Sequence, residues 1–324
     1  MPVNTDKTTS DRLQYLLSRI GNYPKTSEIV RTLVELWPEH IGYCELRFSE
    51  VNAEFEYRMD QVSNLVLNNT GSDLSGYCRD YRWMCEEFLK EEIFFRRNGT
   101  YRLSTFEDAY NEVYSNPDYM GKYVRGILIS QIIWDPHARA FDLFRTTFLD
   151  RLPEQSAYLE VGPGHGLFLY FAAQREKIEK LEAWDVSQSS IAETRGALAN
   201  LGVTRDISII EQDVLKAPSR HDEFDGAVIS EVLEHLERPD LALASLFAAL
   251  KPGGRIFINA PINSPAPDHI YLWRSTDELL ELIKAQGFEI EDAQFLPVTG
   301  ATLANAIRKD LSISCVVIGR KPTH

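Results

Sequence analysis

The sequence predicts an α/β protein in two parts: a mainly helical N-terminal half and a C-terminal half built on a doubly wound sheet. Two observations carry this prediction. Residues 10–148 repeat apolar side chains mostly with the period of helices, whereas residues 158–260 alternate short apolar runs with helical segments. Three glycines at alternate positions follow the first of these runs. We therefore expect two domains, residues 1–150 and residues 151–324.

The composition is that of a globular protein with an acidic excess. The 324 residues are 44% hydrophobic and 25% charged, and the formal net charge is −14. Because nonspecific phosphate binding requires a basic surface, this charge disfavours nucleic acids and anionic membranes as partners. No apolar run is long enough to span a bilayer, and residues 1–6 do not have the pattern of a secretory signal. Four irregularly spaced cysteines agree with a reducing cytoplasm, which we expect as the compartment.

The N-terminal half begins with a series of predicted helices. Apolar residues at helical spacing mark residues 13–20 and 27–37, and longer patterns cover residues 53–67 and 74–95. A polar turn at residues 68–71 separates the last two. This half is therefore expected to be mostly helical.

A β-hairpin is expected at residues 94–103. Asn98-Gly99 is a favoured two-residue hairpin turn, and a helix that leads into a hairpin resembles a winged helix. The preceding helix carries more acidic than basic residues and would repel phosphate. We therefore expect this region to pack against protein rather than DNA.

Two connecting helices are predicted at residues 119–134 and 138–148, separated by Asp135-Pro136. Their isoleucines are expected in an interface core. The candidate pocket residues on the first of them are Met120, Tyr123 and Gln131.

The glycines belong to the segment Glu160-Val-Gly-Pro-Gly-His-Gly166, between a predicted strand and a predicted helix. Gly162, Gly164 and Gly166 allow positive φ and let a ligand approach the backbone. A strand that turns through glycines into a helix N-terminus is typical of nucleotide binding. The spacing differs from Gly-x-Gly-x-x-Gly, which disfavours NAD and FAD.

Further strands with polar ends follow at regular intervals. Residues 178–184 end on Asp185, residues 207–210 are followed by Glu211-Gln212-Asp213, and two more strands are expected at 225–229 and 255–260. Open α/β sheets bind ligands at the carboxyl ends of their strands, where these acids stand.

With these motifs the chain resembles the class I S-adenosylmethionine-dependent methyltransferases over about its last half. The matching motifs are Glu160 to Gly166, Asp185, Gln212-Asp213, residues 230–235 and residues 251–254. The resemblance implies a Rossmann-like sheet of seven strands whose last strand, here residues 313–319, is antiparallel and pairs near residues 288–295.

The resemblance also implies roles for individual residues. Glu160 and the three glycines would hold the methionine part of the cofactor, Asp185 the ribose hydroxyls, and Asp213 with Val214 the adenine. The N-terminal half resembles the dimerisation domain of small-molecule O-methyltransferases, which implies a homodimer and a lid over the acceptor.

The first catalytic candidates follow the fourth strand. Glu231, Glu234 and His235 stand at i, i+3 and i+4, so one helical turn would place them on one face. An imidazole beside a carboxylate suits a general base near neutral pH. The alternative is a segment that only caps the next helix and contacts the edge of the cofactor.

The second candidates lie in the proline-rich loop at residues 261–273, after the fifth strand. The loop presents Asp268 and His269, while Tyr271 and Trp273 are expected to form an apolar wall for the acceptor. The alternative is a surface crossover whose aromatic residues pack on the sheet.

Glu231, Glu234, His235 and His269 together are also a ligand set suited to Mg²⁺, Mn²⁺ or Fe²⁺. They resemble the metal site of the metal-dependent small-RNA 2′-O-methyltransferases. The same residues would serve equally as a base with its orienting carboxylate.

The sequence thus predicts an enzyme (EC 2.1.1.-) that methylates a small molecule, with oxygen favoured, in natural product biosynthesis. The catalytic candidates are His235, His269 and Glu231; His165 is expected to contact the cofactor through its backbone, and His137 is expected to have no role in the site. The alternatives are a metal-assisted methyltransferase and a non-catalytic, cofactor-binding regulatory protein.

Overall fold

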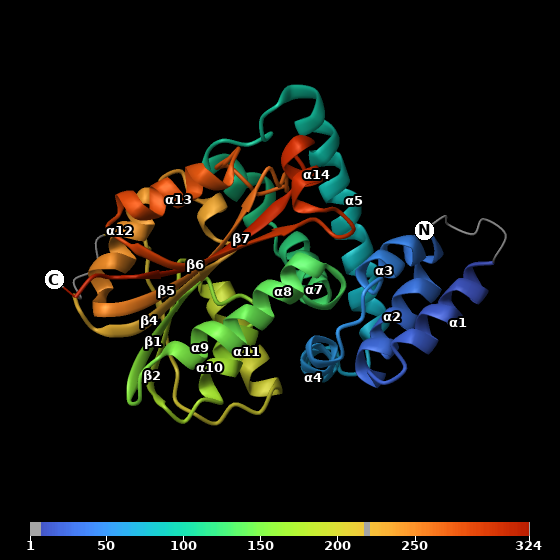
Figure 1. Ribbon diagram of the computed structural model, residues 1–324, viewed down its shortest axis with the longest axis horizontal. Coiled ribbons are helices and arrows are strands. Elements are labelled where there is room, and N and C mark those ends of the chain that lie inside the picture. The colour runs from blue at the N-terminus through green and yellow to red at the C-terminus, as the bar shows by residue number, and fades with distance from the viewer. Residues whose placement is uncertain (1–7, 217–220, 324) are drawn as a thin grey trace.

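The computed structural model describes residues 8–216 and 221–323. Residues 1–6, for which the sequence predicts no secretory signal, lie outside these ranges. A seven-stranded sheet occupies the C-terminal half, and the N-terminal helices gather beside it (Figure 1). Within the described ranges no helix combines the length and the apolar character needed to cross a membrane.

The sheet has the strand order β3-β2-β1-β4-β5-β7-β6, in which only β7 is antiparallel to its neighbours. This confirms the predicted fold class and the predicted antiparallel last strand. The strands are β1 Ser156–Val161, β2 Ile178–Asp185, β3 Ser208–Glu211, β4 Phe224–Ser230, β5 Leu250–Ile262, β6 Glu289–Pro297 and β7 Ile313–Arg320. The strand order reverses between β1 and β4, where open α/β sheets bind their ligands.

Alternate side chains of each strand enter two different cores. In β1, Tyr158 packs into the core shared with the N-terminal helices, whereas Leu159 packs into the core on the opposite face. The helices on the second face are α12 Pro239–Ala249, α13 Thr276–Ala285 and α14 Leu303–Arg308. The first face carries α10 Leu167–Ala173 and α11 Gln188–Asn200 together with helices from the N-terminal half.

The described N-terminal half consists of helices and helical turns. The helices are α1 Thr9–Arg19, α2 Pro24–Leu36, α3 Ile41–Arg47, α4 Ala53–Thr70, α5 Leu74–Asn98, α6 Phe106–Ala109, α7 Pro117–Ile133, α8 Asp135–Leu143 and α9 Leu149–Arg151. Two π-helical turns, Tyr110–Tyr114 and Phe144–Phe148, lie before α7 and after α8. Two connecting helices form as predicted, but the break between them lies at the extended residue Trp134 and not at Asp135-Pro136, which open α8 because proline suits the first turn of a helix.

The predicted β-hairpin at residues 94–103 is wrong, and the winged-helix-like description is wrong with it. α5 continues to Asn98, and Gly99 caps it at φ +70° with its N–H bonded to the carbonyl of Phe95 at 2.8 Å. Asn-Gly suits a helix C-terminus as well as a hairpin, because both require a left-handed residue. An ion pair of 2.6 Å between Arg96 and Glu92 favours the helix in this last turn.

Candidate functional site

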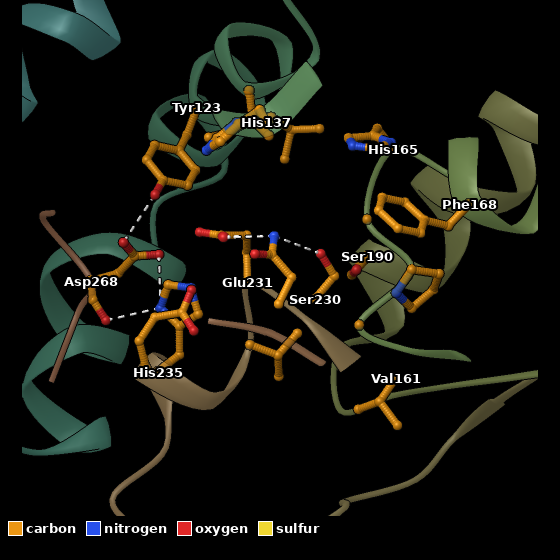
Figure 2. A pocket seen from close by; sticks show the side chains of 18 of the residues that line it. Tyr123, His137, Val161, His165, Phe168, Ser190, Ser230, Glu231, His235 and Asp268 are labelled. Atoms are coloured by element: carbon orange, nitrogen blue, oxygen red, sulfur yellow. Dashed lines mark hydrogen bonds and ion pairs between the residues drawn. The ribbon is translucent and has the colours of Figure 1, made fainter. Parts of the chain in front are cut away.

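A cavity of about 280 Å³ lies at the carboxyl ends of β1, β2, β4 and β5 (Figure 2). It contains most of the residues that the sequence singled out. Those that line it are Glu160, Gly162, Gly164, Asp185, Glu231, Glu234, His235 and His269. Gly166, Asp213 and Val214 are not among the lining residues. Its size is close to the lower limit for pockets that hold small organic ligands.

The glycine loop forms one wall of the cavity. Gly162, Gly164 and Gly166 have φ of +67°, +47° and +74°. Each therefore has a positive φ, which glycine adopts more readily than any other residue. A Cβ on Gly162 would lie 2.6 Å from Val232 Cγ2, whereas a Cβ on Gly164 would meet nothing closer than an oxygen at 4.0 Å. The backbone at Gly164 therefore leaves room for a ligand. Gly166 caps the N-terminus of α10.

Glu160 ends in the cavity with almost no contact with bulk water. It is 3% exposed, and its Oε2 accepts a hydrogen bond of 2.8 Å from the hydroxyl of Tyr158. Burial raises the pKa of Glu160 to about 8. In the free protein the carboxyl is therefore largely protonated at neutral pH.

Asp185 is held at the end of β2 by the start of α11. Its Oδ1 accepts from the Ser187 N–H at 2.9 Å, and its Oδ2 accepts from the Ser190 hydroxyl at 2.7 Å. Burial raises its pKa, while these hydrogen bonds oppose the shift. Asp213 instead accepts from the N–H of Leu215. Val214 is buried in the core on the far face of the sheet.

Two carboxyl groups, Glu231 and Glu234, lie at the end of β4. Glu231 has φ +54°, and its Oε1 accepts from Asn259 Nδ2 at 2.9 Å. Burial raises the pKa of Glu231 to about 7 and that of Glu234 well above its ordinary range, with the neighbouring Glu231 adding to the second shift. Glu234 is fully buried, and among the described residues no N–H donor reaches its carboxyl oxygens; its neighbour Glu231 can only accept a proton from it. The pair therefore shares a proton in the free protein, and only a cation would let both groups ionise.

His235 and His269 meet at this carboxyl group, although they come from different segments. Their rings are 4.9 Å apart, and their Nε2 atoms lie 3.7 Å and 3.9 Å from Glu234 Oε1. The expected helical turn is only a 3₁₀ turn, Leu233–His235, and Glu231 precedes it. His269 reaches the site because the backbone N–H groups of Ile270 and Tyr271 both bond to the carbonyl of Glu234 at 2.9 Å.

The tautomers of both imidazoles follow from their backbone contacts. His269 Nδ1 lies 2.6 Å from the carbonyl of Ser264, and His235 Nδ1 lies 3.1 Å from the carbonyl of Asp268. A carbonyl can only accept, so both Nδ1 atoms carry a proton, and in the neutral form of each ring the lone pair is on Nε2. Burial lowers the pKa of His269 to about 4, which keeps it neutral. The site therefore presents two basic nitrogens to Glu234.

Asp268 and two tyrosines complete this end of the cavity. The hydroxyls of Tyr114 and Tyr123 each donate to Asp268, at 3.0 Å, and Tyr114 also lies 3.2 Å from His235 Nδ1. The sequence had suggested Tyr123 but not Tyr114 as a pocket residue. The four tyrosines spaced between residues 110 and 123 were the sequence signal that could have indicated Tyr114 as a pocket residue.

The apolar part of the cavity comes from both halves of the chain, including Phe168 and Val228 beside the glycine loop, but not from Tyr271 or Trp273 of the proline-rich loop. Trp273 is buried in the core on the far face of the sheet and Tyr271 packs on it, so the predicted aromatic wall is wrong. The apolar lining includes Phe88, Met120, Ile127 and Trp134. Gln131 also lines the cavity, as suggested.

Two histidines for which we expected no side-chain role also line the cavity. His137 was expected to have no role in the site, but it stands in the lining, and its Nδ1 lies 2.9 Å from the Ser130 hydroxyl. His165 stands in the glycine loop, and its Nδ1 accepts from the N–H of Leu167 at 3.2 Å. Burial lowers the pKa of each to about 4, so both are neutral.

Comparisons with known proteins agree with this geometry. Residues 135–293 match the family model Methyltransf_23, described as a methyltransferase domain. Over 113 residues the chain is 32% identical to the ubiquinone/menaquinone biosynthesis C-methyltransferase UbiE of Haemophilus ducreyi, which covers 34% of this chain and 42% of that protein. The UbiE of Pasteurella multocida is 33% identical over 84 residues, 25% of this chain and 31% of that protein. The chain thus matches less than half the length of these curated relatives.

Among solved structures, a SAM dependent methyltransferase from Aquifex aeolicus aligns with a TM-score of 0.43 at 17% identity. The alignment covers 58% of this chain and 92% of that one.

Proposed function

We propose that the protein transfers a methyl group from S-adenosylmethionine to a small-molecule acceptor, a proposal that the match of residues 135–293 to a methyltransferase domain supports. The observation that supports this most is the cavity at the switch point of the sheet, which joins the glycine loop and Asp185 to a separate set of imidazoles. One end suits a nucleoside, and the other end supplies imidazoles that can accept a proton from the methyl acceptor.

We assign the cofactor to the glycine end of the cavity. Gly164 leaves room for the methionine part, Gly162 lines the cavity beside it, and Glu160 would accept a hydrogen bond from its ammonium group. Asp185 would bind the ribose hydroxyls through its carboxylate. Asp213 and Val214 remain our candidates for the adenine, beyond the lining of the present cavity, and Gly166 would shape the loop as the cap of α10.

Methylation of oxygen is the proposed reaction. The donor sulfonium is already activated, so the protein must align a hydroxyl with it and remove the proton. His235 Nε2 and His269 Nε2 are the candidate bases, because each keeps a free lone pair in the neutral ring, and Glu231 is our candidate for stabilising the imidazolium that forms. The UbiE relatives are named C-methyltransferases, so carbon is the competing acceptor. We place the reaction in a biosynthetic pathway for a natural product.

A divalent metal is the second candidate for the imidazole end, and the observation that favours it is the buried Glu234 carboxyl group, which no N–H donor reaches within the described residues. Glu234, His235 and His269 can offer one ligand atom each within 4.8 Å of one another. The Nδ1 hydrogen bonds of both histidines leave Nε2 free, as metal-binding histidines require. When bound, a metal would lower the pKa of an acceptor hydroxyl.

Metal content after dialysis against Mn²⁺ tests this candidate without relying on activity. We expect about one equivalent in the wild type and none in Glu234→Gln or His269→Gln, since each loses a ligand. His221→Gln is the matched control, because His221 is exposed. Equal metal in all four proteins would refute the site.

The organisation of the chain also remains a proposal. We propose that residues 1–150 form a helical unit that closes the acceptor pocket and pairs two subunits, and that residues 151–324 form the catalytic unit. Sedimentation equilibrium should give the mass of a dimer. A monomer at all concentrations would remove the homodimer from this proposal.

Turnover of the histidine variants tests the catalytic proposal. His235→Asn and His269→Asn should each bind S-adenosylmethionine with unchanged affinity, and loss of the base should lower methyl transfer by about 100-fold or more. His221→Asn should match the wild type. Full turnover in both variants would exclude both residues as the base. Tight cofactor binding with no methyl transfer to any acceptor would instead favour a cofactor-binding regulatory protein.

A further inference from the structure

Asp268 is a buried carboxylate that two tyrosines of the N-terminal half hold in place. It is 2% exposed, and its two oxygens each accept one phenolic hydrogen bond of 3.0 Å, Oδ1 from Tyr123 and Oδ2 from Tyr114. Figure 2 shows Asp268 between Tyr123 and His235. No lysine or arginine pairs with Asp268 in the described residues, so its burial is compensated by the nearby imidazoles of His235 and His269 together with these two hydrogen bonds.

The other face of this cluster meets His235. His235 Nδ1 lies 3.1 Å from the backbone carbonyl of Asp268 and 3.4 Å from its Oδ2. The Tyr114 oxygen is 3.2 Å from the same nitrogen. Since the Tyr114 hydrogen points to Asp268, its oxygen is free to accept from the imidazole. All three groups therefore favour the tautomer with a proton on Nδ1.

We infer that Tyr114 and Tyr123 are positioning residues that, by fixing Asp268, orient the His235 ring and keep its Nε2 lone pair directed into the cavity. This inference rests on the proposed function, in which His235 Nε2 faces the acceptor. Neither tyrosine touches the reacting atoms in this role: Tyr123 acts through Asp268, whereas Tyr114 acts through Asp268 and through its own contact with His235 Nδ1.

The two tyrosines come from the part of the chain that precedes the matched methyltransferase domain. Tyr114 ends a π-helical turn and Tyr123 lies in α7, so both precede residue 135, where the match to the methyltransferase family begins. His235 and Asp268 lie inside the matched range. The N-terminal half thus supplies part of the support of the catalytic end, in addition to the apolar wall of the pocket. The methyltransferase domain alone would lack both hydroxyls.

The experiment compares Tyr114→Phe, Tyr123→Phe and the double variant with Tyr119→Phe. Tyr119 lies one turn before Tyr123 on α7 and packs against Trp83, and within the described ranges its hydroxyl makes no hydrogen bond. Each Phe variant removes one hydroxyl and keeps the ring, which limits any loss of folding. Melting temperature verifies that all four proteins are folded.

Two readouts separate positioning from a structural role. In ¹⁵N-histidine spectra, the His235 signals, assigned by their loss in His235→Asn, should show one Nδ1–H tautomer in the wild type and in Tyr119→Phe. The double variant should show a mixture of tautomers. Its kcat should fall about 10-fold or more, with KM for S-adenosylmethionine within twofold, because a buried hydrogen bond to a charged group is lost.

An unchanged His235 tautomer in the double variant overturns the inference. If that variant unfolds, the two single variants carry the same test with one hydroxyl each. The tautomer readout does not need an acceptor or turnover. A wild type that binds S-adenosylmethionine but methylates nothing would count against the proposed function alone, while the spectra would still decide the role of the tyrosines.

Discussion

Replacing Gly164 with alanine should separate cofactor binding from folding. Gly164 has φ +47°, and a Cβ there would meet only the Gly162 oxygen, at 4.0 Å. The folded state therefore suffers backbone strain but no steric clash, a cost of about 1–2 kcal/mol. The added methyl group would nevertheless occupy space beside the cavity in which we place S-adenosylmethionine.

Two other glycines provide matched controls for this substitution. Gly99 caps α5 at φ +70° with nothing within 4 Å of its Cβ position, so Gly99→Ala measures the backbone strain alone. Gly162→Ala adds a contact of 2.6 Å with Val232 Cγ2 and should be the least stable of the three.

The assays are urea unfolding and isothermal titration with S-adenosylmethionine. Gly99→Ala and Gly164→Ala should lose similar free energies of unfolding, whereas only Gly164→Ala should lose cofactor affinity, by about tenfold or more, which corresponds to about 1.4 kcal/mol. Equal affinity in these two variants would refute the assignment of the loop.

Three further predictions concern charge. Because the folded state holds the Glu160 proton up to a pKa of about 8, while the unfolded chain releases it near 4.5, this contribution to stability is complete below pH 4.5 and is lost as the pH rises to about 8. Glu160→Gln should therefore gain stability relative to the wild type in the free protein across this range, by up to about 1.4 kcal/mol per pH unit in urea unfolding, and a constant difference would contradict the shift. Arg47→Met should lower the free energy of unfolding by about 3–5 kcal/mol in the same assay, because it leaves Glu56 without its buried partner at 2.7 Å. Glu56→Gln in that background should recover part of the loss. A loss below about 1 kcal/mol would contradict this reasoning. The described cavity lining contains five carboxyl groups and no lysine or arginine, so a phenol bearing a carboxylate should inhibit methyl transfer at least tenfold more weakly than the matched neutral phenol, and equal inhibition would contradict this.

The sheet could be predicted because its signals are local. The strands β1, β2 and β4 are short apolar runs with a polar end, and the glycine spacing marks the turn after β1. The predicted hairpin failed because Asn98-Gly99 satisfies two structures that need the same left-handed residue, and the sequence alone does not show which one the neighbouring turn favours.

The composition of the site was only partly predictable. Local motifs identified His235 and His269 separately. The two rings lie close together only because backbone N–H groups of the proline-rich loop bond to the carbonyl of Glu234. Tyr114 was missed because its partner Asp268 is 154 residues away, and no periodic pattern connects residues so far apart in sequence. The predicted wall of Tyr271 and Trp273 failed for a different reason, since an aromatic pair in a loop can pack into a core as well as line a pocket.

A crystal structure of the protein grown with S-adenosylhomocysteine tests the central claim most directly. The account predicts density for the nucleoside along the glycine loop, with its ribose hydroxyls on the carboxylate of Asp185 and its sulfur directed toward His235 and His269. Density for the nucleoside in any other place, or a cavity that stays empty at saturating ligand, would contradict it.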